Sequence, residues 1–388
     1  MLLGALNETD GAFFNSLDLW IISKQMASSM SKIKCLLLAV LLTTSTCTQM
    51  HASCADKKPF TNPKGSPTAR NSPADWIFFG ARRILGLGNS SSRNTIQAYA
   101  LDRDIALAGF FQQRTVDTIT WIGHATFLIK IGKIHILTDP FFSNTAGKLG
   151  FGSKRYIPPP INIEDLPQLD IILCSHNHYD HLDIKSLKRI KKKFGAKVQV
   201  FCPLGLTKYF RQCGFTEVQE MRWYEEANHK EVAIRCLPAI HNSGRSLFDK
   251  NKTLWCSFGI KSKAFDIYFS GDTAYHSTIF KEIKTSLGNC DLAIVGIGAY
   301  EPQELLAQYH TNPEQAVRIA LDINAKNIVG MHWGTLNLSD EPVDEPIKRF
   351  KQAAKTQNFT SNAIWLMKLG ETRLLQKDAL VPSIMLNK

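Results

Sequence analysis

Four side chains that can bind metal ions lie within six residues of one another. His176, His178, Asp180 and His181 follow the mainly apolar residues 170–173, which are typical of a buried strand. We expect this strand to end near Ser175 and a helix to begin near His181. The turn between them can direct the first two histidines at one ion and offer Asp180 and His181 to a second. Imidazole nitrogen and carboxylate oxygen suit zinc, and a site that keeps positions open for water is catalytic rather than structural. A lone histidine is usually a core or surface residue, but this spacing predicts a catalytic metal site.

Three further candidate ligands each lie just after an apolar stretch. With the stretches that they follow, they are His241 (232–237), Asp272 (266–271) and His332 (327–331). We expect each stretch to be a strand that ends at one rim of a sheet, where loops on a rigid scaffold collect catalytic groups. Alternating strand and helix patterns, with a hairpin at Gly132, predict an α/β protein with two central mixed sheets flanked by helices.

Eight motifs accompany these residues. They are WIGHAT (121–126), LTDP (137–140), KRY (154–156), SHNHYDHLD (175–183), RSLFD (245–249), SGDT (270–273), IGAYEP (297–302) and MHWGT (331–335). The order His-x-His-x-Asp-His, then His, Asp and His, resembles the metallo-β-lactamase superfamily. The finer motifs resemble its N-acyl-phosphatidylethanolamine-hydrolysing phospholipase D group, from about Pro73 to about Leu375. The resemblance implies the αββα sandwich of that superfamily.

The resemblance also implies a cofactor of two Zn²⁺ per chain. The implied ligands are His176, His178 and His241 for one zinc, Asp180, His181 and His332 for the other, and Asp272 as a bridge opposite a shared hydroxide. Two such cations lower the pKa of bound water and clamp phosphoryl oxygens during in-line displacement. The implied reaction is hydrolysis of N-acyl-phosphatidylethanolamine to N-acylethanolamine and phosphatidic acid.

Other motif positions predict supporting and substrate-binding roles. Asp139, after the strand-like residues 134–138, is the best candidate to accept the free N–H of a metal-bound histidine. His124, in a tight turn between two predicted strands, either supports a ligand or packs. His310 precedes a predicted helix start with Pro313 in its first turn, where contact with substrate phosphate and helix capping are equal alternatives. The predicted catalytic residues are thus Asp180, Asp272, Asp139 and His310, and the predicted substrate-binding residues are Tyr179, His124, Arg155, Asn242 and Tyr300.

Two positions depart from the family pattern. Asn242 follows His241 where relatives often carry Trp, and Gln303 follows the IGAYEP motif where Arg is common. Neither is a ligand, so the predicted zinc chemistry is unaffected. We expect both in the substrate groove, where the loss of an aromatic ring and a cation weakens the case for an identical lipid substrate.

The beginning of the chain predicts export. The basic residues 30–34 and the apolar residues 35–42 resemble a secretory signal peptide, and the apolar run is too short to span a bilayer. Small residues before Cys47 and Cys54 leave lipidation, simple cleavage and a disordered tail as alternatives. We expect a periplasmic or membrane-associated protein, or one on the cytoplasmic face of a membrane if this segment is not a signal.

The predicted organisation has one catalytic domain. Its parts are an uncertain start with a signal-like segment (1–54), a linker rich in Pro, Ser and Lys (55–72), an extension packed on the core (73–112), the catalytic domain (113–376) and a tail (377–388). With 388 residues, 44% of them hydrophobic, the chain can bury a large core. The nine cysteines form no Cys-x-x-Cys pair, so buried free thiols are expected at Cys174, Cys202, Cys236 and Cys256, although export would permit an oxidised pair.

The net charge of +12, from 46 basic and 34 acidic residues, favours an anionic partner. The densest basic cluster, residues 188–193, falls on a predicted helix with Leu187, Ile190 and Phe194 on one face. Its lysines are either a solvated face or a contact with an anionic membrane. We expect a phospholipid substrate at a membrane surface and, by resemblance, a homodimer.

Alternatives within the fold are a nuclease and a hydrolase of lactones or sugar phosphates. No nucleic-acid partner is expected, because the sequence lacks a basic stretch interleaved with aromatic residues. A non-catalytic lipid-binding protein is the remaining alternative. Such a protein usually has eroded ligands, whereas all seven are present here.

Overall fold

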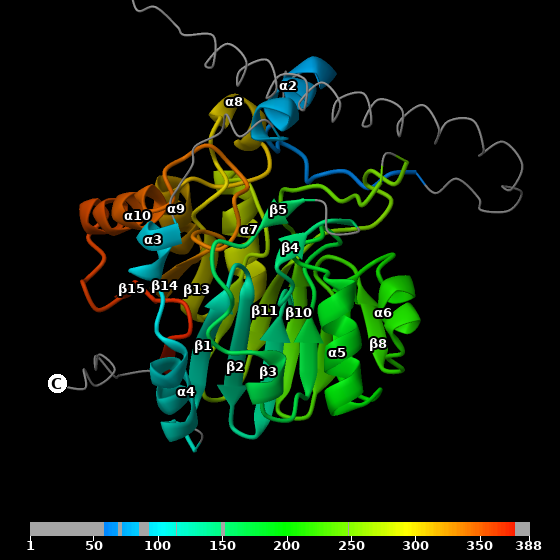
Figure 1. Cartoon of the computed structure of the whole chain (residues 1–388), viewed down its shortest axis with the longest axis vertical. Helices are drawn as coiled ribbons and strands as arrows, with labels where there is room; N and C mark the ends of the chain where they lie inside the picture. The colour runs from blue at the N-terminus through cyan, green and yellow to red at the C-terminus, as the bar shows by residue number, and fades with distance from the viewer. Residues whose placement is uncertain are drawn as a thin grey trace, which may run out of the picture. The chain divides into compact units, whose positions relative to one another are not determined.

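A computed structural model describes residues 58–68, 72–84, 93–113, 115–148, 152–246 and 248–376 (Figure 1). The signal-like segment, the two lipoprotein-like cysteines and the tail 377–388 lie outside the described residues. Within these ranges, no helix combines the length and the apolar character needed to cross a membrane.

Two large mixed sheets form the centre of the fold (Figure 1). The first has the strand order β16 (Thr372–Leu374), β1 (Thr118–Gly123), β2 (Thr126–Ile131), β3 (Ile134–Thr138), β6 (Ile171–Leu173), β7 (Gln199–Pro203) and β8 (Val218–Met221). The second has the order β15 (Ile364–Trp365), β14 (Ala325–Met331), β13 (Cys290–Gly296), β12 (Ile267–Phe269), β11 (Ser257–Lys261), β10 (Val232–Leu237) and β9 (Glu226–His229). A small separate ribbon pairs β4 (Thr145–Ala146) with β5 (Ser153–Lys154).

Helices cover the outer faces of both sheets. On the second sheet, α9 (Pro313–Asp322) packs on β13 and β14, and α7 (Ser277–Leu287) and α10 (Glu345–Thr356) pack on α9. On the first sheet, α6 (Thr207–Cys213) contacts β8 and α5 (Ile184–Phe194), and α4 (Arg103–Gln112) contacts β16. Figure 1 shows α9 and α10 on the opposite side of the sheets from α5 and α6. The predicted αββα sandwich is confirmed.

The inner strands of the first sheet bury both faces. In β7, Phe201 belongs to the core cluster that contains the strands of the second sheet, whereas Val200 and Cys202 belong to the cluster that contains α5 and α6. Ile171 and Ile172 of β6 divide in the same way, as the two-residue period of a strand requires. Strands covered on both faces are continuous apolar runs, which is why they could be predicted from sequence.

The predicted strands before the candidate ligands are present as β3, β6, β10, β12 and β14. The hairpin at Gly132 joins β2 to β3, and this glycine has the positive φ of 56° that such a tight turn requires. The helix after the ligand motif starts later than expected, at Ile184 rather than near His181. Its N-cap is Asp183, whose carboxylate accepts the Lys185 N–H, and this cap leaves residues 176–182 as the ligand-bearing turn.

Part of the basic cluster on α5 makes contacts within the fold. Leu187 and Ile190 are buried, as predicted. Arg189 pairs with Glu164 at 2.7 Å, and the Lys193 ammonium donates to the carbonyls of Ile163, Glu164 and Leu166 around the short helix η2 (Ile163–Asp165). These two cations therefore fasten α5 to its neighbour.

Residues near the amino-terminal end of the described chain pack more closely than a linker would. Phe60 N–H donates to the Asn251 carbonyl, and the side chain of Asn62 accepts the His241 N–H. Residues 58–68, predicted as part of a linker, are therefore packed on the catalytic core. The extension that follows contains α2 (Pro73–Ile84), α3 (Arg93–Gln97) and α4, and it buries Ile96, Ala106 and Phe110.

The cysteines agree with their prediction. In the described part of the chain, the six cysteines are free and buried, among them Cys174, Cys202, Cys236 and Cys256. Burial raises the pKa of the Cys174 and Cys202 thiols well above the ordinary value, so both are inert, neutral core groups.

Candidate metal centre

Three histidine nitrogens and a carboxylate converge where β6, β10 and β12 end. His176 Nε2 lies 2.9 Å from His178 Nδ1, which lies 3.1 Å from His241 Nε2. Asp272 Oδ2 lies 3.8 Å from His176 Nε2 and 3.7 Å from His241 Nε2. Nitrogen ligands in a tetrahedral zinc site are about 3.3 Å apart, so this first group has spacings suited to a single ion.

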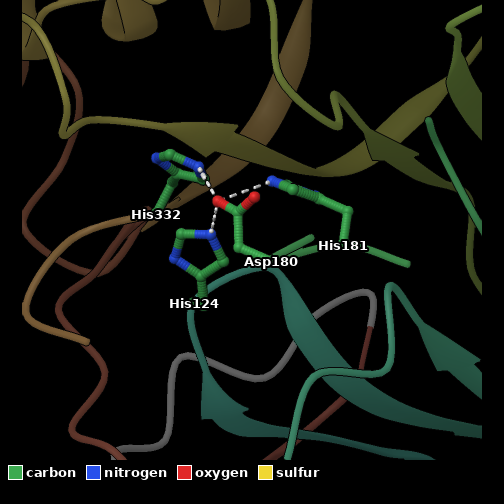
Figure 2. A group of neighbouring side chains, drawn as sticks. All are labelled: His124, Asp180, His181 and His332. Carbon is green, nitrogen blue, oxygen red and sulfur yellow. Dashed lines mark hydrogen bonds and ion pairs between the residues drawn. The ribbon is translucent and has the colours of Figure 1, made fainter. Parts of the chain in front are cut away.

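A second group lies beside the first. Figure 2 shows one carboxylate oxygen of Asp180 facing three imidazole rings. This Oδ2 is 2.8 Å from His124 Nε2, 3.6 Å from His181 Nε2 and 3.7 Å from His332 Nε2. The four residues each offer a ligand atom, all within 4.8 Å of one another.

Asp272 lies between the two groups. Besides its contacts with the first group, its Oδ2 lies 3.1 Å from His181 Nε2 and its Oδ1 lies 3.2 Å from His332 Nε2. A single carboxylate thus faces ligand atoms of both groups. This is the position that the sequence resemblance implies for a bridging ligand.

Unpaired buried atoms provide a test of whether metal ions fit. Among the described residues, His181 Nε2, His332 Nε2 and Asp272 Oδ1 are buried without a hydrogen bond of acceptable geometry. Native proteins rarely leave such atoms unpaired without a functional reason. All three atoms face the space between the ligand groups, and imidazole nitrogen with carboxylate oxygen is a donor set for divalent transition metals. The residues present therefore fit two divalent cations.

Asp139 holds two of the ligand histidines from behind. Its Oδ2 accepts His181 Nδ1–H at 2.7 Å and the Ser175 hydroxyl at 2.6 Å, while its Oδ1 accepts the Ser175 N–H at 2.7 Å. Ser175 Oγ lies in turn 2.9 Å from His176 Nδ1. Asp139 is fully buried, and its contact with His181 Nδ1 is the supporting contact that the sequence predicted, so it is a positioning residue.

The ring of His241 is oriented by the backbone. Its Nδ1 lies 2.9 Å from the Tyr309 carbonyl, which can only accept. Nδ1 must therefore carry the proton, and Nε2 is left as the lone-pair nitrogen that faces the first group.

The ligand set divides into neutral and charged groups. Burial lowers the pKa of His176 and His241 well below the ordinary value, so both rings are neutral and ready to ligate at pH 7. Burial alone would raise the pKa of Asp272, but His181 and His332 lower it well below its usual range. Burial likewise opposes the charge on His332, yet Asp272 beside it raises that pKa to about 9.

Three residues with a strained backbone lie at the same place. His124, Asp139 and His332 adopt the positive φ values of 57°, 32° and 62°, which non-glycine residues rarely do. Gly271, with a φ of 54°, precedes Asp272, and a Cβ there would lie 2.6 Å from Ser175 Cβ. Such strain persists only where the surroundings fix it, as at functional sites.

Comparisons with known proteins agree with this geometry. Residues 135–333 match the model of the beta-lactamase superfamily domain. The N-acyl-phosphatidylethanolamine-hydrolyzing phospholipase D 1 of Caenorhabditis elegans is 36% identical over 306 residues, which cover 76% of this chain and 84% of that protein. The chain belongs to the metallo-β-lactamase superfamily, in the group of these phospholipases.

Other members extend the comparison. The mitochondrial N-acyl-phosphatidylethanolamine-hydrolyzing phospholipase D of Saccharomyces cerevisiae is 37% identical over 259 residues, 65% of this chain and 55% of that protein. The isothiocyanate hydrolase from Delia radicum gut bacteria shares the fold, with a TM-score of 0.53 and 17% identity over 66% of this chain and 98% of that one. The chain is accordingly a metallo-hydrolase of the β-lactamase fold.

Two of the predicted substrate-binding residues line a groove beside the first group of candidate metal ligands. Tyr179 and Asn242 border it together with His178, Arg245 and Lys250, and its volume is about 530 Å³. Grooves of this size hold small-molecule substrates. The Arg245 guanidinium stacks 3.9 Å above the Tyr179 ring, which fixes that ring at the groove wall.

Three other predicted substrate contacts are placed differently. Arg155 donates to the carbonyls of Phe141 and Ser143, so its guanidinium holds the loop after Asp139. Tyr300 is buried and its hydroxyl donates to Glu345 Oε1 at 2.9 Å. Both side chains serve internal packing. His124 is buried among the ligands, so its contact with Asp180 replaces the predicted contact with substrate.

The loop before α9 separates the two alternatives for His310. The N-cap of α9 is Asn312, whose side chain accepts the Gln315 N–H at 2.9 Å, so the capping role for His310 is wrong. His310 Nδ1 instead lies 3.9 Å from Asp272 Oδ2. Gln303, which we expected in the groove, hydrogen-bonds Glu301 at the start of α8 (Gln303–Leu306) and does not line it.

The sequence reasoning assigned no role to several residues of the site. Ser175 and Arg245 stood inside quoted motifs, so their positions were signalled even though their contacts were not. Asn62 and the Tyr309 carbonyl carried no signal, because both reach His241 through contacts between distant parts of the chain.

Proposed function

We propose that this chain is a dinuclear zinc phosphodiesterase of phospholipase D type. It would hydrolyse N-acyl-phosphatidylethanolamine, or a related glycerophospholipid, to N-acylethanolamine and phosphatidic acid. The observation that carries the proposal is the pair of ligand groups that share Asp272. The names of two relatives, 36% and 37% identical, support the substrate class.

The ligand assignment follows the two groups. One ion would be held by His176, His178 and His241, the other by Asp180, His181 and His332, with Asp272 shared. Two divalent cations in these positions would lower the pKa of water and neutralise charge on a phosphodiester during in-line displacement. His124 hydrogen-bonds Asp180 and so positions one of its oxygens.

The reaction needs a proton for the leaving group. The water oxygen bonds to phosphorus, the bond from phosphorus to the ethanolamine oxygen breaks, and that oxygen takes up a proton. His310 lies beside Asp272, and its side chain keeps 16% of its surface exposed. Burial lowers the pKa of His310 to about 4, so its ring is neutral at pH 7 and its N–H can hydrogen-bond a phosphate oxygen or the leaving oxygen. The proton that the leaving oxygen takes up comes from the attacking water, which loses one as its oxygen bonds to phosphorus.

The groove gives the substrate a path to the ligand groups. His178, a ligand, and Asn242, the neighbour of the ligand His241, both line it. Arg245 donates to the carbonyls of Asn177 and Leu182, and these two hydrogen bonds fix its guanidinium in the wall of the groove. Lys250 is exposed at the same groove and is placed to contact an anionic head group.

Exposed apolar side chains support a membrane surface as the place of reaction. Ile77 and Phe78 on α2 are 72% and 67% exposed, and Phe248, close to Lys250, is 76% exposed. The Trp76 ring of α2 lies 6.0 Å from the ring of Tyr309, whose carbonyl orients His241. Apolar residues close to the site, on a chain of net charge +12, suit shallow insertion into an anionic interface.

Incubation of metal-replete protein with vesicles of mixed phospholipids tests the proposal. With N-acyl-phosphatidylethanolamine included, mass spectrometry should find N-acylethanolamine and phosphatidic acid, and a chelator should stop their release. Binding of two metal ions without turnover of any lipid would refute the phospholipase assignment. It would redirect the search to nucleotides, lactones and sugar phosphates.

A further inference from the structure

Asn62 connects the packed segment 58–68 to the loop that carries His241. Its Oδ1 accepts the His241 backbone N–H at 2.9 Å and the Trp255 indole N–H at 2.9 Å. His241 and Trp255 are both buried. One amide oxygen, far away in the sequence, thus accepts from two buried donors beside the first ligand group. The Trp255 indole N–H also donates to the Ala239 carbonyl at 3.0 Å, so the His241 N–H is the donor that depends on Asn62.

The backbone of His241 depends on this contact. Strand β10 ends at Leu237, so His241 lies beyond the ladder that pairs β10 with β11. A buried N–H without a hydrogen-bond partner is strongly disfavoured. Loss of the Asn62 oxygen would leave the His241 N–H unpaired unless the backbone moved far enough to reach water. Any such movement would also move His241 Nε2, which lies 3.1 Å from His178 Nδ1.

The rest of the segment keeps Asn62 in place. Phe60 N–H donates to the Asn251 carbonyl at 2.8 Å, and Asn251 N–H donates to the Ser243 carbonyl at 2.8 Å. The Asn251 side chain also accepts the Ser243 N–H at 3.1 Å. The segment is therefore attached to both sides of the turn that contains His241 and the groove residue Asn242.

We propose that Asn62 is a positioning residue of the metal centre. Its amide oxygen fixes the backbone of His241, and the Tyr309 carbonyl fixes the ring, so that Nε2 remains directed at the point shared with His176 and His178. The inference rests on the proposed function, because it takes His241 as a ligand. It adds a residue from outside the predicted catalytic domain to the site.

Full-length Asn62→Ala, Asn62→Asp and wild-type proteins test the proposal. Aspartate keeps an oxygen at the position of Oδ1, whereas alanine removes it. The exposed Asn289, immediately before β13, provides a matched Asn289→Ala control. The two metal affinities are measured by competition of Zn²⁺ with a chelator, and the ligand geometry by the visible spectrum of the Co²⁺-loaded proteins.

Asn62→Ala should lower one of the two affinities by roughly ten- to hundredfold and change the Co²⁺ spectrum, while Asn62→Asp and Asn289→Ala remain close to wild type. Wild-type affinities and spectrum in Asn62→Ala would overturn the proposal, and so would an Asn62→Asp protein as impaired as Asn62→Ala. If Asn62→Ala does not fold, Asn62→Leu, which keeps a side chain of similar volume but removes the oxygen, takes its place with the same expected and contrary results. A wild-type protein that binds no metal would instead overturn the proposed function.

Discussion

Replacement of Asp139 by asparagine should disable one half of the metal centre. In the wild type, Oδ2 accepts two hydrogen bonds, from His181 Nδ1–H and from the Ser175 hydroxyl, and Oδ1 accepts one from the Ser175 N–H. An asparagine has one oxygen and one NH₂ group in the same space. If the NH₂ group replaces Oδ2, it meets the His181 N–H, and if it replaces Oδ1, it meets the Ser175 N–H. No orientation of the amide satisfies both donors.

A change of His181 tautomer would remove the clash between the asparagine NH₂ group and the His181 N–H. With its proton on Nε2, His181 would accept from the amide but could no longer ligate through the atom that faces Asp180 and Asp272. Loss of such a partner typically lowers metal affinity ten- to hundredfold, which is about 1.4 to 2.7 kcal/mol. The loss should fall on the ion held by Asp180, His181 and His332.

Metal content after dialysis against a graded series of chelator concentrations measures this effect. Asp139→Asn should retain one ion where the wild type retains two. A matched control is Asp291→Asn, because Asp291 is equally buried and accepts the Asp266 N–H at 2.9 Å, near the start of β13 and away from the ligands. Two ions bound with wild-type affinity in Asp139→Asn would refute the reasoning, as would equal metal loss in the control.

Three further predictions concern the metal ligands and the exposed apolar residues of α2. Asp272→Asn and His178→Ala should each abolish hydrolysis of N-acyl-phosphatidylethanolamine in a folded protein, and turnover in either purified variant would contradict the ligand assignment. In the metal-free protein, the His332 pKa of about 9 means that a proton competes with the metal, so zinc affinity should rise by up to about tenfold per pH unit from pH 7 to 9. Titration calorimetry should detect the released protons at pH 7, and a pH-independent affinity would refute this competition. The double change Ile77→Ser and Phe78→Ser should weaken binding to anionic vesicles by about tenfold or more with unchanged metal content, whereas equal vesicle binding would exclude α2 from the membrane contact.

Strands and the ligand motif could be predicted from sequence because their signals are local. Residues 171–173 form β6 as expected, since a strand buried on both faces is an uninterrupted apolar run. The start of α5 was placed too early because Asp183, rather than a ligand, is the N-cap. The ligands themselves were recognisable because several metal-binding side chains at short spacing seldom serve another purpose.

Contacts behind the ligands could not be predicted in the same way. Arg155 and Tyr300 belong to motifs near the site, yet a motif does not indicate in which direction a side chain points, and both point into the packing. Asn62 was taken for linker sequence because its surroundings are rich in polar residues and proline. Its partner His241 lies 179 residues away, and only the folded chain brings the two together.

Hydrolysis in water enriched in ¹⁸O tests the central claim most directly. Metal-replete protein is given N-acyl-phosphatidylethanolamine, and both products are weighed by mass spectrometry. Attack of water at phosphorus predicts one ¹⁸O in the phosphate of phosphatidic acid and none in N-acylethanolamine, with no reaction in chelator. Label in the N-acylethanolamine hydroxyl, or turnover that survives removal of the metal, would contradict a metal-dependent phosphodiesterase of phospholipase D type.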